Sequence, residues 1–233
     1  MNINEYISIL VEDTSNELLK IYFNNHENRK TKLIFPENKN GDKRISEQEM
    51  RFTLLNIHEK NSSNLYYSVE TPTTEDYGFS SDGKRRASSD LSFYNADVKV
   101  LNIELKAHNA EEDAINKDIE KLVSEDCNGA WIQLLKSENK GSVKRLFEKF
   151  EEAFKKYNHS LKPISFYILI LETQTLLYRQ GKEDDNYKAE PIFNIDFSIW
   201  KNLEAGKYYF NNSIRTDEKN DFDWEIIKFE IKK

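Results

Sequence analysis

The hydrophobic positions of the chain repeat with two periods, and each period predicts one type of secondary structure. Apolar residues three or four positions apart predict helices over residues 46–58, 110–125 and 142–157, because such residues fall on one face of a helix. Shorter runs of aliphatic, β-branched and aromatic residues predict strands. The expected strands are residues 65–70, 88–94, 98–106, 129–135 and 164–171, with further β elements over 191–200, 207–210 and 224–231. This order indicates an α/β fold in which helices flank a central sheet.

Two of these strands differ in their expected burial. Residues 164–171 are apolar at nearly every position, which is typical of a strand buried on both faces. A turn at residues 172–175 is expected to lead into a partner strand. Residues 224–231 alternate between apolar and polar side chains, which predicts a half-exposed strand.

The two ends of the chain are harder to interpret than its middle. Near the N-terminus, Asp13-Thr14-Ser15 can cap a helix over residues 15–23, and this region is expected to pack outside the core as an extra helix or strand. A length of 233 residues with few glycines and prolines predicts one domain, residues 1–233. Its core is expected over about residues 45–172, with additions at both ends.

Residues 88–94 and 98–106 are expected to form a hairpin, because Asn95-Ala96-Asp97 between them is turn chemistry. Side chains of a strand alternate between its two faces. In the second strand the apolar face carries Leu101, Ile103 and Leu105, and the polar face carries Asn102, Glu104 and Lys106.

Two carboxylates of this hairpin are expected to lie close together. A turn centred on Ala96 places Asp90 opposite Asn102, on the polar face. Glu104 is then a diagonal neighbour of Asp90, roughly 7–8 Å away. Such a pair can hold Mg²⁺ or Mn²⁺ and leave the other coordination positions to water and phosphate. Lys106 points to the same spot, where its ammonium can orient a water, stabilise developing charge or, if its pKa falls, act as a base.

The composition narrows the classes of partner. The formal net charge is −7, so a nucleic-acid partner requires a local basic patch. Cys127 is the single cysteine, which rules out an internal disulfide and favours a reducing cytoplasm. The sequence has no signal-peptide pattern and no apolar stretch of the ~18 residues that a membrane span needs, so we expect no membrane partner.

Asp90, a variable gap and then Glu104-Leu105-Lys106 resemble the signature of the PD-(D/E)XK nuclease superfamily, the restriction-endonuclease-like fold. The resemblance covers about residues 45–136, with weaker support to 172, and Ser89 stands where the family name has proline. It implies a core of helix, three strands, helix and strand around a mixed sheet. It also implies hydrolysis of phosphodiester bonds in DNA, favoured over RNA, with a divalent cation at Asp90 and Glu104. A role in nucleic-acid defence or processing, and a homodimer that cuts both strands, are further expectations of this kind.

Glu49, in the expected helix 46–58, has two interpretations. With Ser46 three residues before it, Glu49 fits a capping box. On a helical wheel it faces the packed side, next to Phe52, whereas Glu47 lies at the margin. Nucleases of this resemblance often carry a glutamate on the first helix, aimed at the metal. Glu49 is favoured over Glu47 for that role, and the capping alternative stays open.

A basic run precedes the first carboxylate. Lys84, Arg85 and Arg86 bring positive charge a few residues before Asp90. Because phosphates are bound mainly by arginine and lysine, these residues are candidates for contact beside the scissile bond. A solvated loop is the alternative. Arg86 is favoured, since even-numbered positions share the face of Asp90 if the strand extends that far.

Two functions without catalysis remain open. An acid-x-lysine triplet arises by chance in a chain with 32% charged residues. The chain is then a nucleic-acid- or protein-binding module that keeps the nuclease fold, or a structural subunit whose acidic pair caps local backbone.

Overall fold

The structure of the protein is a computed structural model that describes most of the chain. The described residues are 2–61, 63–77, 85–138, 142–157, 162–183, 185, 193, 203–211, 214–216 and 224–231. They form a mixed α/β fold with four helices and a nine-stranded sheet. The helices are α1 (Ile3–Tyr22), α2 (Glu47–Lys60), α3 (Glu112–Ser124) and α4 (Ser142–Tyr157). None of these helices combines the length and the apolar character needed to cross a bilayer.

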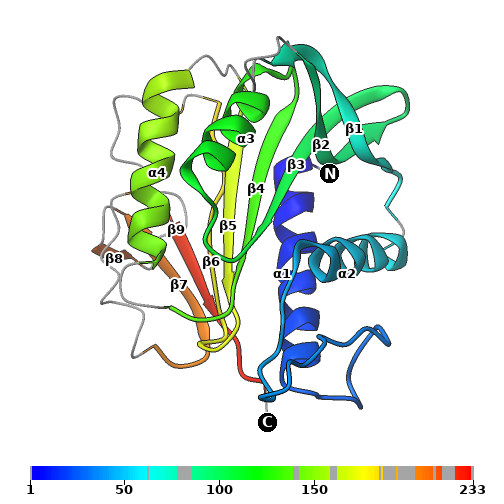
Figure 1. The fold of residues 1–233 in the computed structure, drawn as a ribbon, viewed down its shortest axis with the longest axis vertical. Coiled ribbons are helices and arrows are strands. Elements are labelled where there is room, and N and C mark those ends of the chain that lie inside the picture. The colour runs from blue at the N-terminus through cyan, green and yellow to red at the C-terminus, as the bar shows by residue number, and fades with distance from the viewer. Residues whose placement is uncertain are drawn as a thin grey trace.

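The sheet has a parallel centre and antiparallel flanks. Across the sheet the strands are β1 (Tyr66–Tyr77), β2 (Arg85–Asn95), β3 (Val98–Ala107), β4 (Asn128–Leu135), β5 (Ile164–Ile170), β6 (Thr175–Arg179), β9 (Trp224–Lys228), β7 (Gly206–Asn211) and β8 (Ile214–Thr216). The pairs β3–β4 and β4–β5 are parallel, and the other pairs are antiparallel. Parallel neighbours need a crossover connection, which α3 and α4 provide. Both crossover helices lie on one face of the sheet, and α1 and α2 lie on the other (Figure 1).

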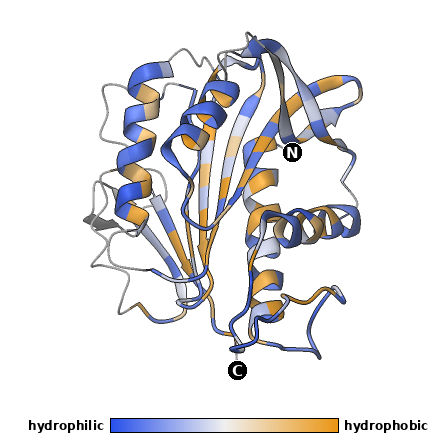
Figure 2. Ribbon diagram, viewed as in Figure 1, coloured by the Kyte–Doolittle hydropathy of each residue, from blue (hydrophilic) through white to orange (hydrophobic). Residues whose placement is uncertain are grey.

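Each face of the sheet has its own hydrophobic core. One core joins α1 and α2 to the strands, and the other joins α3 and α4 to them. Strand β5 serves both, since Tyr167 belongs to the first core and Phe166 to the second. All of its residues are buried, as predicted for a strand covered on both sides. Hydrophobic residues therefore run along the central strands, whereas α4 carries a hydrophobic and a hydrophilic side (Figure 2).

The central elements agree with the sequence. Helix α4 has the predicted bounds, α2 and α3 differ by about two residues at an end, and the β2–β3 hairpin is present. Strand β6 follows β5 as its antiparallel partner. Helix α3 begins two residues later than predicted, with Glu111 as its N-cap residue, whose side chain makes no capping hydrogen bond.

The prediction for the N-terminus was also wrong. Helix α1 is continuous from Ile3, with the side chain of Asn2 accepting a hydrogen bond from the backbone of Asn4 as the cap. Thr14 and Ser15 are buried inside the helix, and the Thr14 hydroxyl donates back to the Leu10 carbonyl at 2.7 Å. This back-bond satisfies the hydroxyl within the helix, so the residue does not need a cap position.

Three further expectations for strands need correction. Strand β1 continues through Pro72 to Tyr77, because β1 is an edge strand and an edge tolerates the missing N–H of proline. Strand β9 is buried and not half-exposed, since Trp224 and Ile226 belong to the α3–α4 core while Ile227 packs on the other face. Strand β8 was not expected. The predicted β element over residues 191–200 falls, apart from residue 193, outside the described residues.

Candidate active site

The β2–β3 hairpin brings the predicted carboxylates together in a register that differs from the expected one. Ser92, and not Asp90, lies opposite Asn102, and the two side chains hydrogen-bond at 2.6 Å. The turn is tighter than assumed, because Asn95 pairs directly with Val98. In addition, Val100 has no partner between the pairs on either side of it, so β3 holds one extra residue there. The predicted face is right, but the expected pairing of Asp90 with Asn102 is wrong by two residues.

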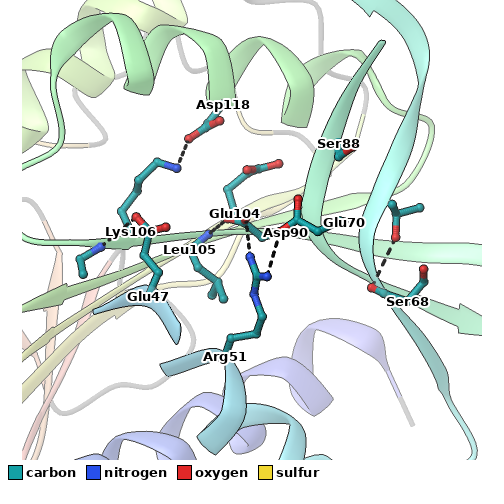
Figure 3. A network of polar contacts seen from close by, with 12 residues as sticks. Glu47, Arg51, Ser68, Glu70, Ser88, Asp90, Glu104, Leu105, Lys106 and Asp118 are labelled. Atoms are coloured by element: carbon teal, nitrogen blue, oxygen red, sulfur yellow. Dashed lines mark hydrogen bonds and ion pairs between the residues drawn. The ribbon is translucent and has the colours of Figure 1, made fainter. Parts of the chain in front are cut away.

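The corrected register moves Asp90 toward the acid-x-lysine triplet. The described pair of the β2–β3 ladder that lies nearest to Asp90 is Leu91 with Ile103. Beyond that pair the Asp90 carboxylate takes the place of a backbone partner: its Oδ2 accepts a hydrogen bond from the Leu105 N–H at 2.7 Å (Figure 3). Asp90 therefore lies at the point where β2 and β3 separate.

A cation from α2 reaches Asp90 from the other side. Arg51 contacts Asp90 Oδ1 through Nη2 at 2.8 Å, and Glu70 Oε1 through Nη1 at 2.8 Å (Figure 3). Glu70 falls between the pairs Val69–Leu91 and Thr71–Ser89, hence opposite Asp90, and its φ of 50° is in the left-handed region. Such a backbone conformation is uncommon for a residue other than glycine and is concentrated at functional sites.

Glu104 is the most buried acid of the site. The residue is 1% exposed, and its Oε2 accepts a hydrogen bond from Lys121 Nζ at 2.6 Å. Its Oε1 has no hydrogen-bond partner among the described residues. Burial raises the pKa of Glu104 well above its usual range, the neighbouring carboxylates of Asp118 and Asp90 raise it further, and Lys121 opposes them.

Lys106 and Lys121 share one acid on α3. Asp118 forms an ion pair of 2.7 Å with Lys106 through Oδ2 and one of 2.8 Å with Lys121 through Oδ1. Lys121 also donates to the Ser88 carbonyl at 3.1 Å. Burial lowers the pKa of Lys106, but the hydrogen bond to Asp118 and the charges of Asp118, Asp90 and Glu47 together outweigh burial, so the pKa is raised. A protonated Lys106 suits the orienting or charge-stabilising role better than that of a base.

The two glutamates at the start of α2 have different surroundings. Among the described residues, Glu49 accepts a hydrogen bond from the Ser46 hydroxyl and lies 3.6 Å from Arg44, so its contacts are with the start of α2 and the loop before it. Glu47 accepts a long hydrogen bond of 3.4 Å from the Ala107 N–H, and its charge raises the pKa of Lys106. The first-helix acid that lies next to Lys106 is therefore Glu47.

The residues predicted to contact phosphate lie at the start of β2, away from the hairpin turn. The backbones of Arg85 and Arg86 pair with Tyr77 and Asp76, so the strand extends as far as the argument for Arg86 required. Lys84 and the side chains of both arginines fall outside the described part of the structure.

Four charged residues of the site were missed by the sequence argument: Arg51, Glu70, Asp118 and Lys121. A signal existed for one of them. On the helix predicted over residues 110–125, Asp118 falls three residues after Ile115 and four before Leu122, hence on the apolar face. A charged residue on that face is expected to meet a buried partner.

The oxygen donors at the site suit a hard cation such as Mg²⁺ or Mn²⁺. No group of three or more His, Cys, Asp or Glu side chains in the described residues is arranged to hold a metal ion. Mg²⁺ needs fewer, since it keeps several waters and binds proteins through one or two carboxylates. The unpartnered Oε1 of Glu104, beside Asp90, fits this requirement. Arg51 and Lys121 balance the charge of the two acids in the present arrangement.

Comparisons of the chain with protein families, with curated proteins and with solved structures found no match. The resemblance to the PD-(D/E)XK nucleases therefore stays a prediction that depends on the residues and the geometry described above.

Proposed function

We propose that this protein is a divalent-metal-dependent nuclease that hydrolyses phosphodiester bonds, with DNA favoured over RNA. The observation that supports it most is the convergence of Asp90 and Glu104, from neighbouring strands, with Lys106 where β2 separates from β3. These three charged side chains are of the types that the resemblance requires. Burial of Glu104 and Lys106 disfavours their charged forms, which costs free energy of folding.

The order of elements is a second support. Around the site it is α2, β1, β2, β3, α3 and β4, which is the order of helix, three strands, helix and strand that the resemblance implies. In this restriction-endonuclease-like arrangement the two acids come from the second and third strands. The acid-x-lysine triplet lies on the strand that leads into α3.

In this proposal Asp90 and Glu104 hold the Mg²⁺ or Mn²⁺ ion. When bound there, the cation supplies Lewis-acid polarisation of a phosphoryl oxygen and a lower pKa for water. Lys106 orients the water and stabilises negative charge, and Asp118 holds Lys106 in place at 2.7 Å. Glu47 takes the first-helix position that the sequence argument gave to Glu49.

Arg51 and Lys121 have a role in this proposal as well. Both cations now contact the two acids that hold the metal. A divalent cation that binds these acids competes with both side chains, which are then available to pair with phosphate oxygens. Positive charge of this kind at the site offsets part of the repulsion between a phosphodiester and a protein of net charge −7.

The test is cleavage of plasmid DNA and of single-stranded DNA and RNA with Mg²⁺, with Mn²⁺ and with EDTA. We expect cation-dependent cleavage that Asp90→Asn and Glu104→Gln each reduce by several orders of magnitude. Asp97→Asn is the matched control, because it removes the same charge from the exposed turn of the same hairpin. Cleavage by Asp90→Asn or Glu104→Gln at the rate of Asp97→Asn contradicts the proposal.

One observation favours a second candidate, a binding module without catalysis. Among the described residues, the carboxylates of Asp90 and Glu104 accept hydrogen bonds from Arg51, Lys121 and the Leu105 N–H, and a purely structural ion-pair network has the same kind of contacts. The melting temperature separates the two candidates, because a ligand that binds the folded state stabilises it. An unchanged melting temperature with Mg²⁺ and Mn²⁺ at millimolar concentrations supports the binding module.

A further inference from the structure

A small hollow lies between the first turns of α4 and the loop that joins β3 to α3. Its volume is about 120 Å³, and it is lined by Asn109, Ala110, Ser142, Arg145, Leu146 and Lys149. Pockets for drug-sized molecules measure roughly 300–1,000 Å³. This hollow therefore suits a group of only a few heavy atoms.

One residue of its wall carries a hydroxyl that lacks a hydrogen bond. Ser142 is 9% exposed, and its buried Oγ has no partner among the described residues. Buried polar atoms are nearly always hydrogen-bonded in folded proteins, so an exception needs an explanation. A ligand with an acceptor oxygen at this place would provide the missing hydrogen bond.

The charge around the hollow is positive. Arg145 and Lys149 line it, and the first turn of α4 contains no acidic residue. Lys149 is held at its wall by a hydrogen bond of 2.8 Å to the Ala110 carbonyl. Ser142 is also the first residue of a 16-residue helix, whose leading N–H groups and dipole attract an anion. A small ligand that accepts hydrogen bonds and carries negative charge matches all of these features.

The hollow lies on the same face of the sheet as the candidate active site. Lys106 Nζ is 5.9 Å from the ring of Trp131, which packs edge-on against Phe150 of α4 at 5.1 Å, and Phe150 follows Lys149. Lys106 and Asn109 are three residues apart, so their Cα atoms are separated by at most about 11 Å. A nucleic-acid strand advances about 3.4 Å per nucleotide along a duplex, so about three nucleotides span this distance.

We propose that the hollow binds a phosphate group of the nucleic-acid strand, within about three nucleotides of the bond that is cut. The inference rests on the proposed function for the identity of the ligand, and on Ser142, Arg145 and Lys149 for its chemistry. The phosphate is either an internal diester of the strand or a terminal monoester. In both cases Ser142 donates one hydrogen bond and the two basic side chains neutralise the charge.

The first experiment is a titration of the whole ¹⁵N-labelled protein with inorganic phosphate, followed by NMR. We expect saturable shifts centred on the amides of Ser142 to Arg145, and their loss in Ser142→Ala and in Arg145→Gln. Lys144→Gln is the matched control, because Lys144 is exposed, precedes Arg145 and lies 3.8 Å from Glu148 instead of lining the hollow. Absence of shifts at Ser142 to Arg145, or equal shifts in the Arg145 and Lys144 variants, overturns the inference.

The second experiment measures the binding of oligonucleotides with and without a 5′-phosphate, in EDTA so that no cleavage occurs. Loss of one phosphate contact reduces the slope of log K against log salt by about 0.7 for a single strand. We expect this reduction for Arg145→Gln and not for Lys144→Gln. A reduction with both oligonucleotides identifies an internal diester, and a reduction with the phosphorylated one alone identifies a terminal monoester. Equal slopes for the two variants overturn the inference.

Neither experiment depends on catalysis. If the protein does not hydrolyse nucleic acid under any of the metal conditions above, the nuclease proposal fails, and the phosphate titration still decides whether the hollow is an anion site. If hydrolysis is found but Arg145→Gln binds phosphate and oligonucleotides as the Lys144 variant does, only the inference about the hollow fails.

Discussion

The two acids of the candidate site are held in opposite ways. Asp90 pairs with Arg51, and their side chains are 16% and 12% exposed; Arg51 also pairs with Glu70, whose side chain is 59% exposed. Glu104 pairs with Lys121, and their side chains are only 2% and 8% exposed. An ion pair in contact with water exchanges partners at little cost, whereas a buried pair is strongly destabilised when one partner is removed. The comparison shows one acid whose ion-pair network reaches solvent through Glu70, and one whose network is buried.

The largest expected effect comes from breaking the buried pair. Lys121→Met leaves Glu104 without its ion-pair partner and Asp118 with one lysine instead of two, and we expect a loss of about 3–5 kcal/mol in the free energy of unfolding, measured with urea. Lys117→Met, on the exposed side of the same helix, should change it by less than about 0.5 kcal/mol. Adding Glu104→Gln to Lys121→Met should restore part of the loss. Equal effects of the two lysine substitutions would show that the buried pair is not strong.

The second effect concerns pH. Burial raises the pKa of Glu104 in the folded state, so the protonated form is favoured there relative to the unfolded chain. The stabilisation is complete below the unfolded pKa of about 4.3 and is lost as the pH rises through the folded pKa. We therefore expect Glu104→Gln to gain stability relative to the wild type between pH 4 and pH 8, in urea unfolding at each pH. A difference that does not change with pH contradicts the raised pKa.

The third effect is smaller, because the ion pairs of Arg51 extend to the exposed Glu70. Arg51→Gln should lower the free energy of unfolding by about 1–2 kcal/mol, between the values typical of exposed and of buried pairs. It should also strengthen the binding of Mg²⁺ by up to about fivefold, the equivalent of ~1 kcal/mol, since a competing cation is removed from Asp90. Isothermal titration calorimetry measures the affinity. Weaker Mg²⁺ binding in Arg51→Gln would mean that Arg51 supports the cation site instead of competing for it.

The smallest effect separates the two glutamates of α2. Glu47→Gln should lower kcat by about threefold, or ~0.7 kcal/mol in the barrier, because Glu47 lies beside Lys106. Glu49→Gln should leave kcat unchanged and cost about 1 kcal/mol or less of stability through its contact with Ser46. Steady-state kinetics and urea unfolding of both variants measure these effects. A larger loss of kcat in Glu49→Gln would return the first-helix role to Glu49.

The comparison also explains which parts of the site could be predicted from the sequence. Alternation along a strand is a local property, and it correctly put Glu104 and Lys106 on one face of β3, where both pair with residues of α3. Register depends on the turn and on bulges, and the extra residue Val100 changed the partner of Asp90. No periodic pattern reveals such a residue before the strands are paired.

The contacts between elements were harder still. Helical spacing places Asp118 on a buried face, but it does not identify Lys106 and Lys121 as its partners, since that depends on how α3 crosses β3. Arg51 reaches Asp90 from a separate element 39 positions away along the chain. Local patterns therefore identified Asp90, Glu104 and Lys106 as candidates, and the packing of the helices against the sheet added Arg51, Asp118 and Lys121.

The hydrogen bond between the Leu105 N–H and the Asp90 carboxylate makes one backbone amide proton sensitive to the state of the candidate site. The backbone of β3 pairs with that of β4 from Leu101 to Ala107, but the Leu105 amide proton depends on the ionisation and position of one side chain. Its rate of exchange with deuterium should therefore change when a cation binds Asp90, while the surrounding ladder stays protected. A single backbone proton can thus follow the state of the site before any substrate has been identified.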